Sequence, residues 1–326
     1  MAHLSRDSPA DGDSTRDRGQ ILLIAGLALG VTFVALALVL NAAIFTENLA
    51  SRGETTGGDD AVRFVQEVTR GGTELLTYEN HNATASTDHS TLFGRLDAGV
   101  ATVDDVVTRQ RTGISATASL AANGSASTNG TRIWQANASR AFTNATGADD
   151  WTLADGIDRT RAFRLSVDGG SLLSGCGLFN DCFYLNVTDG SEFWRVQIYD
   201  SSPVTVAVEN ESGATEYCSS NEATVDIDLT AGTVDGEGCS ALDFGDAPDS
   251  GYDITFTNSD QVTGTYSLVV DDPAIASGAT PSDYATGSNS PNATVAVYEL
   301  VLDSDYGTAA VDYTTHLRLA PGEPDA

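Results

Sequence analysis

Four cysteines are the residues of this chain whose type and spacing most clearly predict covalent chemistry. Local loop closure favours pairing the first with the second and the third with the fourth, although four cysteines allow three pairings. A zinc site is the alternative, but neither pair has the short spacing of zinc ligands, and no histidine lies near them. Two disulfides, each worth about 3 kcal/mol, are therefore expected. The residues are Cys176, Cys182, Cys218 and Cys239.

Two aspartates form the best candidate for a cation site. Asp303 and Asp305 belong to the run Asp-Ser-Asp-Tyr-Gly, which starts like a calcium-binding loop. The run lacks the rest of the twelve-residue pattern and its closing glutamate. A tight hairpin turn between two strands is the alternative explanation. We predict no other metal site and no cofactor.

No nucleophile and base can be paired from the sequence. The chain has four histidines, and it contains neither Gly-x-Ser-x-Gly nor His-Glu-x-x-His. A phosphate-binding loop is excluded because its lysine is missing. Acidic residues are so frequent that no two of them can be assigned as acid and base. We therefore expect a protein that is not an enzyme, with a surface hydrolase as the alternative.

Eight Asn-x-Ser/Thr sequons predict glycosylation in an extracellular region. Four of them crowd residues 113–150, where glycans would sit on solvated loops. All eight follow the apolar segment described below. The asparagines are Asn82, Asn123, Asn129, Asn137, Asn144, Asn186, Asn210 and Asn292.

The charge balance of the chain limits its partners and indicates its source. Among 326 residues there are 46 acids and 16 basic residues, all of them arginine, for a net charge of -30. This balance excludes nucleic acid as a partner. A hydrophobic content of 41% excludes a disordered acidic tail. An acidic, folded chain without lysine indicates adaptation to molar salt, so we expect a halophilic archaeon as the source.

An apolar segment near the N-terminus predicts a membrane helix. No charged residue lies between Arg18 and Glu47, and nothing in 21–40 is more polar than Thr32. A helix of this length crosses a bilayer, whereas a buried soluble helix would show a polar face. The flanking charges, the sequons and the cysteines favour an exterior C-terminal part. We expect a single-pass protein of the cell membrane, in contact with lipid through residues 20–45.

The residues before this segment resemble the class III signal peptide of archaeal type IV pilins and archaellins. The run Arg-Asp-Arg-Gly-Gln, residues 16–20, leads directly into the apolar segment. The resemblance implies that a prepilin peptidase cuts between Gly19 and Gln20 and removes residues 1–19 as a leader. An ordinary signal-peptidase cut after Ala43 is the alternative.

In that family the retained helix bundles with those of other subunits into a filament core. Gly26 and Gly30 form a small-xxx-small pair that would allow two such helices to approach closely. The chain departs from the family at the fifth mature position, where a glutamate is usual and Ile24 stands here. This departure puts efficient polymerisation in doubt and fits a minor subunit that stays anchored in the membrane.

Hydrophobic periodicity predicts a mainly β fold outside the membrane. Residues 46–112 show helical spacing, with one helix ending at the Gly71-Gly72 pair and a second apolar stripe at Leu92, Leu96, Val100, Val103 and Val107. A connector rich in Ser, Thr and Asn follows at 113–150. Apolar and polar residues then alternate through 151–320, which predicts an antiparallel β-sandwich. Residues 321–326 are expected to form an exposed tail.

These features predict a pilin-like extracellular surface protein that acts through assembly or surface contact, with other pilin-like subunits as partners. The alternative is a monomeric, signal-anchored binding or adhesion module. The Gly19-Gln20 junction favours the first function, and Ile24 favours the second.

Overall fold

The chain divides into two compact units, Met1–Val62 and Arg63–Ala326. The computed structural model describes residues 58–324 except 114, 177–180, 214, 276–282, 286, 288–289 and 310. The predicted leader, the Gly19-Gln20 junction and the predicted membrane helix with Gly26 and Gly30 lie outside the described residues. No helix within the described residues is long and apolar enough to cross a membrane.

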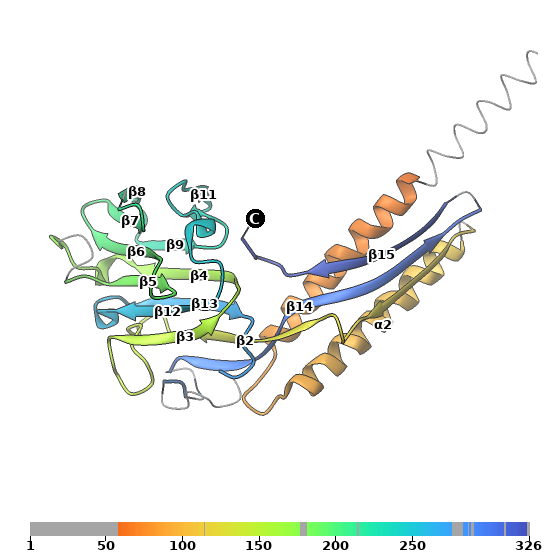
Figure 1. Cartoon of the computed structure of the whole chain (residues 1–326), viewed down its shortest axis with the longest axis horizontal. Coiled ribbons are helices and arrows are strands. Elements are labelled where there is room, and N and C mark those ends of the chain that lie inside the picture. Colours follow the sequence, from red (N-terminus) through yellow and green to blue (C-terminus); the bar gives the residue numbers. More distant parts are fainter. Residues whose placement is uncertain are drawn as a thin grey trace, which may run out of the picture. The chain divides into compact units, whose positions relative to one another are not determined.

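The second unit is mainly β with antiparallel sheets, as predicted (Figure 1). Residues 58–81 are helical, and α2 (His89–Thr112) follows. Short 3-10 turns lie at Gly169–Ser171, Phe244–Asp246 and Ser259–Gln261. The strands are β1 (Thr117–Ala122), β2 (Thr128–Gln135), β3 (Trp151–Ile157), β4 (Thr160–Asp168), β5 (Tyr184–Thr188), β6 (Phe193–Asp200), β7 (Val204–Asn210), β8 (Thr215–Ser220), β9 (Thr224–Asp228), β10 (Thr233–Val234), β11 (Glu237–Gly238), β12 (Tyr252–Thr257), β13 (Gly264–Val270), β14 (Asn292–Gly307) and β15 (Asp312–Leu319).

Two sheets form the predicted sandwich. The large sheet has the order β1-β14-β2-β13-β4-β9-β10-β11, with β15 paired to β14, and the small sheet has the order β3-β12-β5-β6-β7-β8. Alternate residues of each strand face a shared core, so that Phe163 and Leu165 of β4 and Trp194 and Val196 of β6 are almost fully buried. The period of two in the sequence therefore marks the inner face of each sheet.

Strand β14 belongs to two parts of the unit. Its first half pairs with β2 inside the sandwich, and its second half pairs with β1 on one side and β15 on the other. The register against β2 shifts between Val297 and Glu299. The buried side chain of Asn80 fixes this shift, because it accepts from the Val297 amide and donates to the Val297 carbonyl, both at 2.9 Å.

The second half of β14, with β1 and β15, carries the helices on one face. We call these three strand segments, the helical residues 63–81 and α2, with the loop between the two helices, the stalk. In α2, Asp88 caps the first turn, and the predicted residues Leu92, Leu96, Val100 and Val107 are buried. The helix lies against β1 and β14, so its apolar stripe forms a core separate from the sandwich core.

The first helix continues through Gly71-Gly72, so the prediction that it ends there was wrong. Gly72 faces the sheet, where an added Cβ would lie 2.4 Å from Leu319 Cδ1 and 3.0 Å from Leu302 Cδ1. Gly71 has no atom within 4 Å of such a Cβ. Glycine at position 72 therefore allows close packing of helix on sheet, and this packing outweighs the low helix propensity of the pair.

This difference between adjacent glycines gives a matched test. Gly71→Ala should raise the free energy of unfolding of the full chain by about 0.5–1 kcal/mol, because alanine has the higher helix propensity. Gly72→Val should lower it by about 1–3 kcal/mol through overpacking against Leu302 and Leu319. Denaturant unfolding followed by circular dichroism measures both. Equal effects of the two substitutions would contradict the packing argument.

The predicted connector at 113–150 is part of the folded sheets. It contributes β1 and β2, and Phe142 is fully buried in the sandwich core. Arg140 holds the loop around Phe142 by donating to the carbonyls of Thr143 at 2.6 Å and Asn144 at 2.7 Å. The sandwich therefore begins before residue 151. The sequence did not predict β1 because its side chains are mostly small and bury little apolar surface. The strand is held by its backbone pairing with β14.

The predicted exposed tail is docked on the sandwich, which corrects a second expectation. Residues 321–324 are ordered against β4, where the Pro321 carbonyl accepts from Arg161 Nη1 at 2.9 Å and the Gly322 carbonyl accepts from the Ala162 amide at 2.6 Å. Both donors lie about 160 residues earlier in the chain. The C-terminal segment thus docks on residues far away in the sequence, which local sequence patterns cannot predict.

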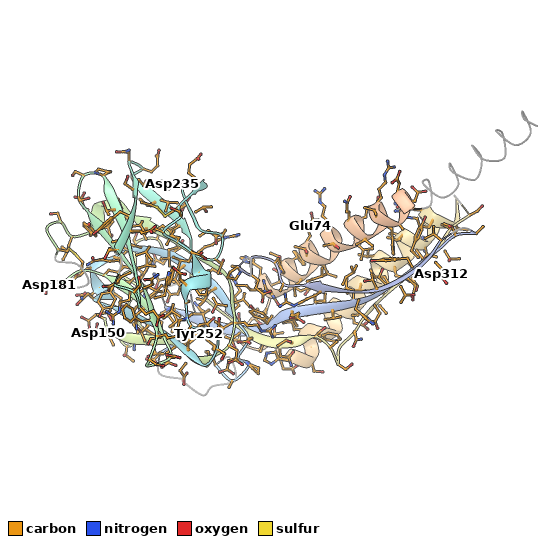
Figure 2. The ribbon with its side chains drawn as sticks, turned by 45° about the horizontal axis from the view of Figure 1, so that its top comes forward. Glu74, Asp150, Asp181, Asp235, Tyr252 and Asp312 are labelled. Atoms are coloured by element: carbon orange, nitrogen blue, oxygen red, sulfur yellow. A yellow bond between two sulfur atoms is a disulfide. The ribbon has the colours of Figure 1, made fainter. Side chains whose placement is uncertain are left out.

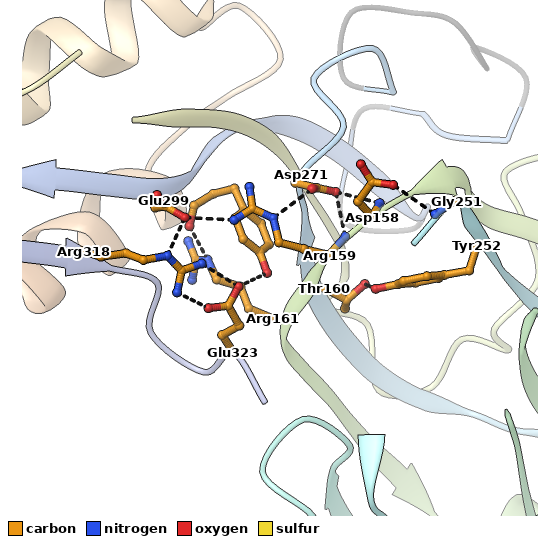
Figure 3. A network of polar contacts seen from close by, with 11 residues as sticks. Asp158, Arg159, Thr160, Arg161, Gly251, Tyr252, Asp271, Glu299, Arg318 and Glu323 are labelled. Atoms are coloured by element: carbon orange, nitrogen blue, oxygen red, sulfur yellow. Dashed lines mark hydrogen bonds and ion pairs between the residues drawn. The ribbon is translucent and has the colours of Figure 1, made fainter. Parts of the chain in front are cut away.

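A chain of ion pairs follows from this docked segment (Figure 3). Glu323 pairs with Arg318 of β15, and Arg318 Nε donates to Glu299 of β14 at 2.7 Å. Glu299 also accepts from Arg159 Nη1 at 2.9 Å, and Arg159 Nε donates to Asp271 at 3.2 Å. The network connects the stalk strands to two loops of the sandwich, beside the register shift of β14.

The docked carboxylate gives a pH-dependent prediction. Burial raises the pKa of Glu323, but hydrogen bonds from Arg318 and Tyr298 lower it by more, so its pKa lies below the usual value. The resulting stability is present above the unfolded-state pKa of glutamate and is lost as pH falls through the lower folded-state value. Glu323→Gln should therefore destabilise the full chain by about 1 kcal/mol near neutral pH and by less near pH 3.

Thermal unfolding at the two pH values measures this effect. Glu237→Gln is the control, because Glu237 is exposed in β11 and its described contacts are those of the backbone ladder. If Glu323→Gln lowers the stability of the chain by the same amount at both pH values, the prediction is wrong.

Candidate binding site on the sandwich

Side chains on the outer face of the large sheet form a continuous row across its strands. Trp134 of β2 is paired with Ser267 of β13, Ser267 with Arg164 of β4, and Arg164 with Asp228 of β9. The alternation of the strands places these residues opposite the core, since Ile133, next to Trp134, is fully buried. One polar surface with one aromatic ring therefore lies across four strands.

A depression of about 530 Å³ lies over this row. Arg132 and Trp134 form one side, and Asp226 and Asp228 of β9 lie on the other. The volume falls within the range of about 300–1,000 Å³ that is typical of small-molecule sites. Hydroxyl groups complete the lining, from Ser166, Thr265 and Ser267.

The guanidinium of Arg132 makes no ion pair with a described residue, although Asp226 and Asp228 line the same depression. Its Cζ lies 5.1 Å from the centroid of the Trp134 ring, and within the described part of the chain it makes no side-chain hydrogen bond or ion pair. Burial lowers the pKa of Arg132 to about 10. Arg164 differs, because its Nε donates to Asp228 at 2.6 Å. Arg132 is therefore a partly desolvated cation that can accept an anionic partner.

A smaller depression of about 260 Å³ adjoins the first and shares Arg132 and Arg164 with it. Arg161 and His81 also line it, and its described lining contains no carboxylate. Burial lowers the pKa of Arg161 to about 10, and its guanidinium donates to backbone carbonyls that include Tyr298 O at 2.7 Å. Arg132, Arg161 and Arg164 thus meet at one place, and we call them the basic cluster; among them Arg164 is paired with Asp228.

A third depression lies on the other side of Trp134, where β14 adjoins β2. Thr294 is paired with Arg132 across the two strands, and Asn292 is paired with Trp134. Both Trp134 Nε1 and Thr294 Oγ1 are buried without a hydrogen-bond partner. Unused polar groups therefore lie near Arg132, and within the described residues none of them hydrogen-bonds its guanidinium. The arrangement can bind a polar or anionic group.

The sequence did not mark this site in advance. The alternation in Arg132-Ile133-Trp134-Gln135 indicates a strand with Arg132 and Trp134 on one face, and this is the signal that could have found two of its residues. Arg161 and Arg164 join them through the strand order β2-β13-β4. That order depends on tertiary pairing, so the basic cluster could not be read from spacing.

The structure confirms the two predicted disulfides. Cys176 pairs with Cys182, with a Cα–Cα distance of 5.8 Å, and Cys218 pairs with Cys239 at 6.1 Å. The second bond links β8 to the segment after β11, at the end of the two sheets. None of the four cysteines lines the two depressions that share Arg132 and Arg164.

The predicted cation candidates lie in a strand. Asp303 and Asp305 are inside β14, and the hairpin turn that follows is at 308–311. Asp303 accepts from Asn123 at 3.1 Å and pairs with His316 at 2.7 Å, and these contacts lower its pKa. Asp305 accepts from Thr314 at 2.7 Å. Among the described residues, no group of three or more His, Cys, Asp or Glu side chains is placed to hold a metal.

The eight sequon asparagines differ in exposure. Asn82 and Asn129 are exposed, Asn123, Asn137, Asn186 and Asn210 are half-buried, and Asn144 and Asn292 are buried. Asn144 donates to Asp283 at 2.7 Å, and Asn292 donates to the carbonyls of Gly287 at 2.9 Å and Ser290 at 2.7 Å. A glycan on either buried amide would displace these hydrogen bonds.

Sequon occupancy should follow this exposure. We expect glycans at Asn82 and Asn129 and none at Asn144 or Asn292, because the buried amides are held inside the fold. Glycopeptide mass spectrometry of protein isolated from its native cells measures occupancy at each position. A glycan found on Asn144 or Asn292 in the folded protein would contradict this expectation.

Comparison with known families finds one similarity. Residues 15–162 match the profile of a family described as "Family of unknown function (DUF7261)". The matched segment runs from the predicted leader through both helices and β3 to the start of β4, and it includes Arg132, Trp134 and Arg161. No curated protein and no solved structure matches the chain.

Proposed function

We propose that this chain is a membrane-anchored, pilin-like surface protein that acts through contact and assembly. The observation that carries the proposal is the junction Arg18-Gly19-Gln20 placed directly against an uncharged segment of membrane-spanning length. The folded part supports it: helical residues pack on one end of a long strand, and the other end of that strand builds a sandwich closed by two disulfides.

The surface of the second unit suits a protein that faces concentrated salt. Figure 2 shows Asp150, Asp181 and Asp235 projecting from the sandwich and Glu74 and Asp312 projecting from the stalk. All five are exposed. Carboxylates of this kind keep a chain soluble and separate from its neighbours. We therefore propose an extracellular location in a halophilic archaeon, with the apolar helix providing anchorage and association.

A monomeric binding module is the second candidate. The unpaired guanidinium of Arg132 in an open depression favours it, because such a group is costly to keep without an anionic partner. Ile24 at the position of the usual pilin glutamate favours it too. In this function the membrane helix anchors a single copy, and the sandwich presents the site to the exterior.

The N-terminus of the mature chain tests the pilin-like function. We expect mass spectrometry of protein from its native membrane to find a chain that begins at Gln20. Gly19→Val should leave the leader attached, and Gly53→Val, far from the junction, is the control that should not. A wild-type chain that keeps its leader would indicate an ordinary signal anchor, and one cut after Ala43 would indicate a released domain. Either result would overturn the pilin-like function.

A further inference from the structure

We infer that the outer face of the large sheet binds an acidic saccharide, by which we mean a sugar ring that carries one carboxylate. The site comprises the two depressions that share Arg132 and Arg164. This inference deepens the proposed contact function by naming the ligand of the sandwich. Its test is a binding measurement on the purified chain. The saccharide inference can therefore fail while the leader is processed as proposed, and leader processing can fail while the saccharide binds.

Charge identifies the anionic part of the ligand. The chain carries a net charge of -30 and only 16 arginines, yet Arg132, Arg161 and Arg164 line one small depression whose described lining has no carboxylate. Arg161 is committed to backbone carbonyls and Arg164 to Asp228, which leaves the guanidinium of Arg132 available. A planar carboxylate can accept two parallel N–H bonds from such a group.

The neighbouring groups identify the rest of the ligand. Trp134, beside Arg132, borders the larger depression, and an indole ring supplies apolar area against the C–H face of a sugar. Hydroxyls of Ser166, Thr265 and Ser267 and the carboxylate of Asp226 line the same depression, and they can exchange hydrogen bonds with sugar hydroxyls. The volume of about 530 Å³ is of the size that small-molecule ligands occupy.

The same lining limits the charge of the ligand. Asp226 and Asp228 lie across the depression from Arg132, so a second anionic group placed there would meet like charges. The net charge of the chain also repels a dense polyanion such as nucleic acid. One carboxylate at the Arg132 end, with neutral hydroxyls toward β9, satisfies both conditions. A free inorganic anion would use Arg132 alone and leave the aromatic and hydroxyl groups unused.

Tryptophan fluorescence of the full chain in detergent and constant molar KCl provides the test. Trp134 is half-buried, whereas Trp151 and Trp194 are 7% and 0% exposed, so a ligand in the depression should change the emission of Trp134 selectively. The probes are methyl α-D-galacturonoside, which carries one carboxylate, the neutral methyl α-D-galactoside and sodium acetate. We expect saturable binding of the galacturonoside, with the galactoside and acetate each at least tenfold weaker.

Two arginine substitutions supply the matched comparison. Arg132→Met keeps the aliphatic stem but removes the guanidinium, and we expect it to weaken binding of the galacturonoside at least tenfold. Arg95→Met removes the same charge from an exposed position on α2, and it should change affinity less than twofold. Far-UV circular dichroism of each variant confirms that it is folded. If Arg132→Met is unfolded, the inference is tested by the relative affinities of the wild-type chain for the three probes.

Each contrary result overturns the inference in a defined way. Equal affinity for the galactoside and the galacturonoside would remove the role of the carboxylate. Equal affinity for acetate and the galacturonoside would reduce the site to an anion site without a saccharide. If Arg132→Met binds the galacturonoside as tightly as the wild-type chain does, the ligand site lies elsewhere. If the wild-type chain does not bind the galacturonoside, the proposed ligand class is wrong.

Discussion

The pairing of β14 with two different sets of strands is the constraint on which the rest of the second unit depends. A single strand of 16 residues takes part first in the sandwich and then in the stalk. Its register against β2 shifts between Val297 and Glu299, and the buried Asn80 makes a reciprocal pair of hydrogen bonds with the Val297 backbone at that shift. The helices, the docked C-terminal segment and the ion-pair network all assemble around this point. Loss of the register would therefore disturb both cores at once.

Arginine is scarce in this chain, and several of the described arginines hold parts of the fold together. Arg140 holds the loop around Phe142 together through carbonyls of that loop, and Arg161 fastens the C-terminal segment through a backbone carbonyl. In the stalk, Arg111 donates to Glu67 at 2.7 Å and lies 5.8 Å from the Phe64 ring centroid. Short hydrogen bonds of this kind keep most of their strength in concentrated salt, where charges more than about 3 Å apart are screened at 1 M. The guanidinium of Arg132 differs from these because it makes no ion pair within the described residues, and it is therefore the arginine that is available to bind a ligand.

Much of the fold could be predicted from the sequence, because burial on one face imposes a period. The alternation at Phe163, Leu165 and Val167 and the helical stripe from Leu92 to Val107 both mark buried faces. The disulfide pairing followed from local loop closure. These features share one property, since each is decided by residues close together in the chain.

What could not be predicted depends on partners far away in the sequence. The first helix passes through Gly71-Gly72, and Leu302 and Leu319 pack closely against one of these two positions, where glycine needs no shift of either side chain. The C-terminal segment docks on Arg161, and strands β1 and β2 are held by β14. The basic cluster likewise needs the order β2-β13-β4, which no local pattern encodes.

The continuity of β14 also determines how the second unit would carry mechanical load. Hydrogen bonds between antiparallel strands run perpendicular to the strand axis. A pull along β14 between the stalk and the sandwich would therefore load its bonds to β2, β1 and β15 together, in shear. Peeling the strands apart one pair at a time would require a force in another direction. A contact made on the sandwich would thus be held against drag by the whole length of one strand.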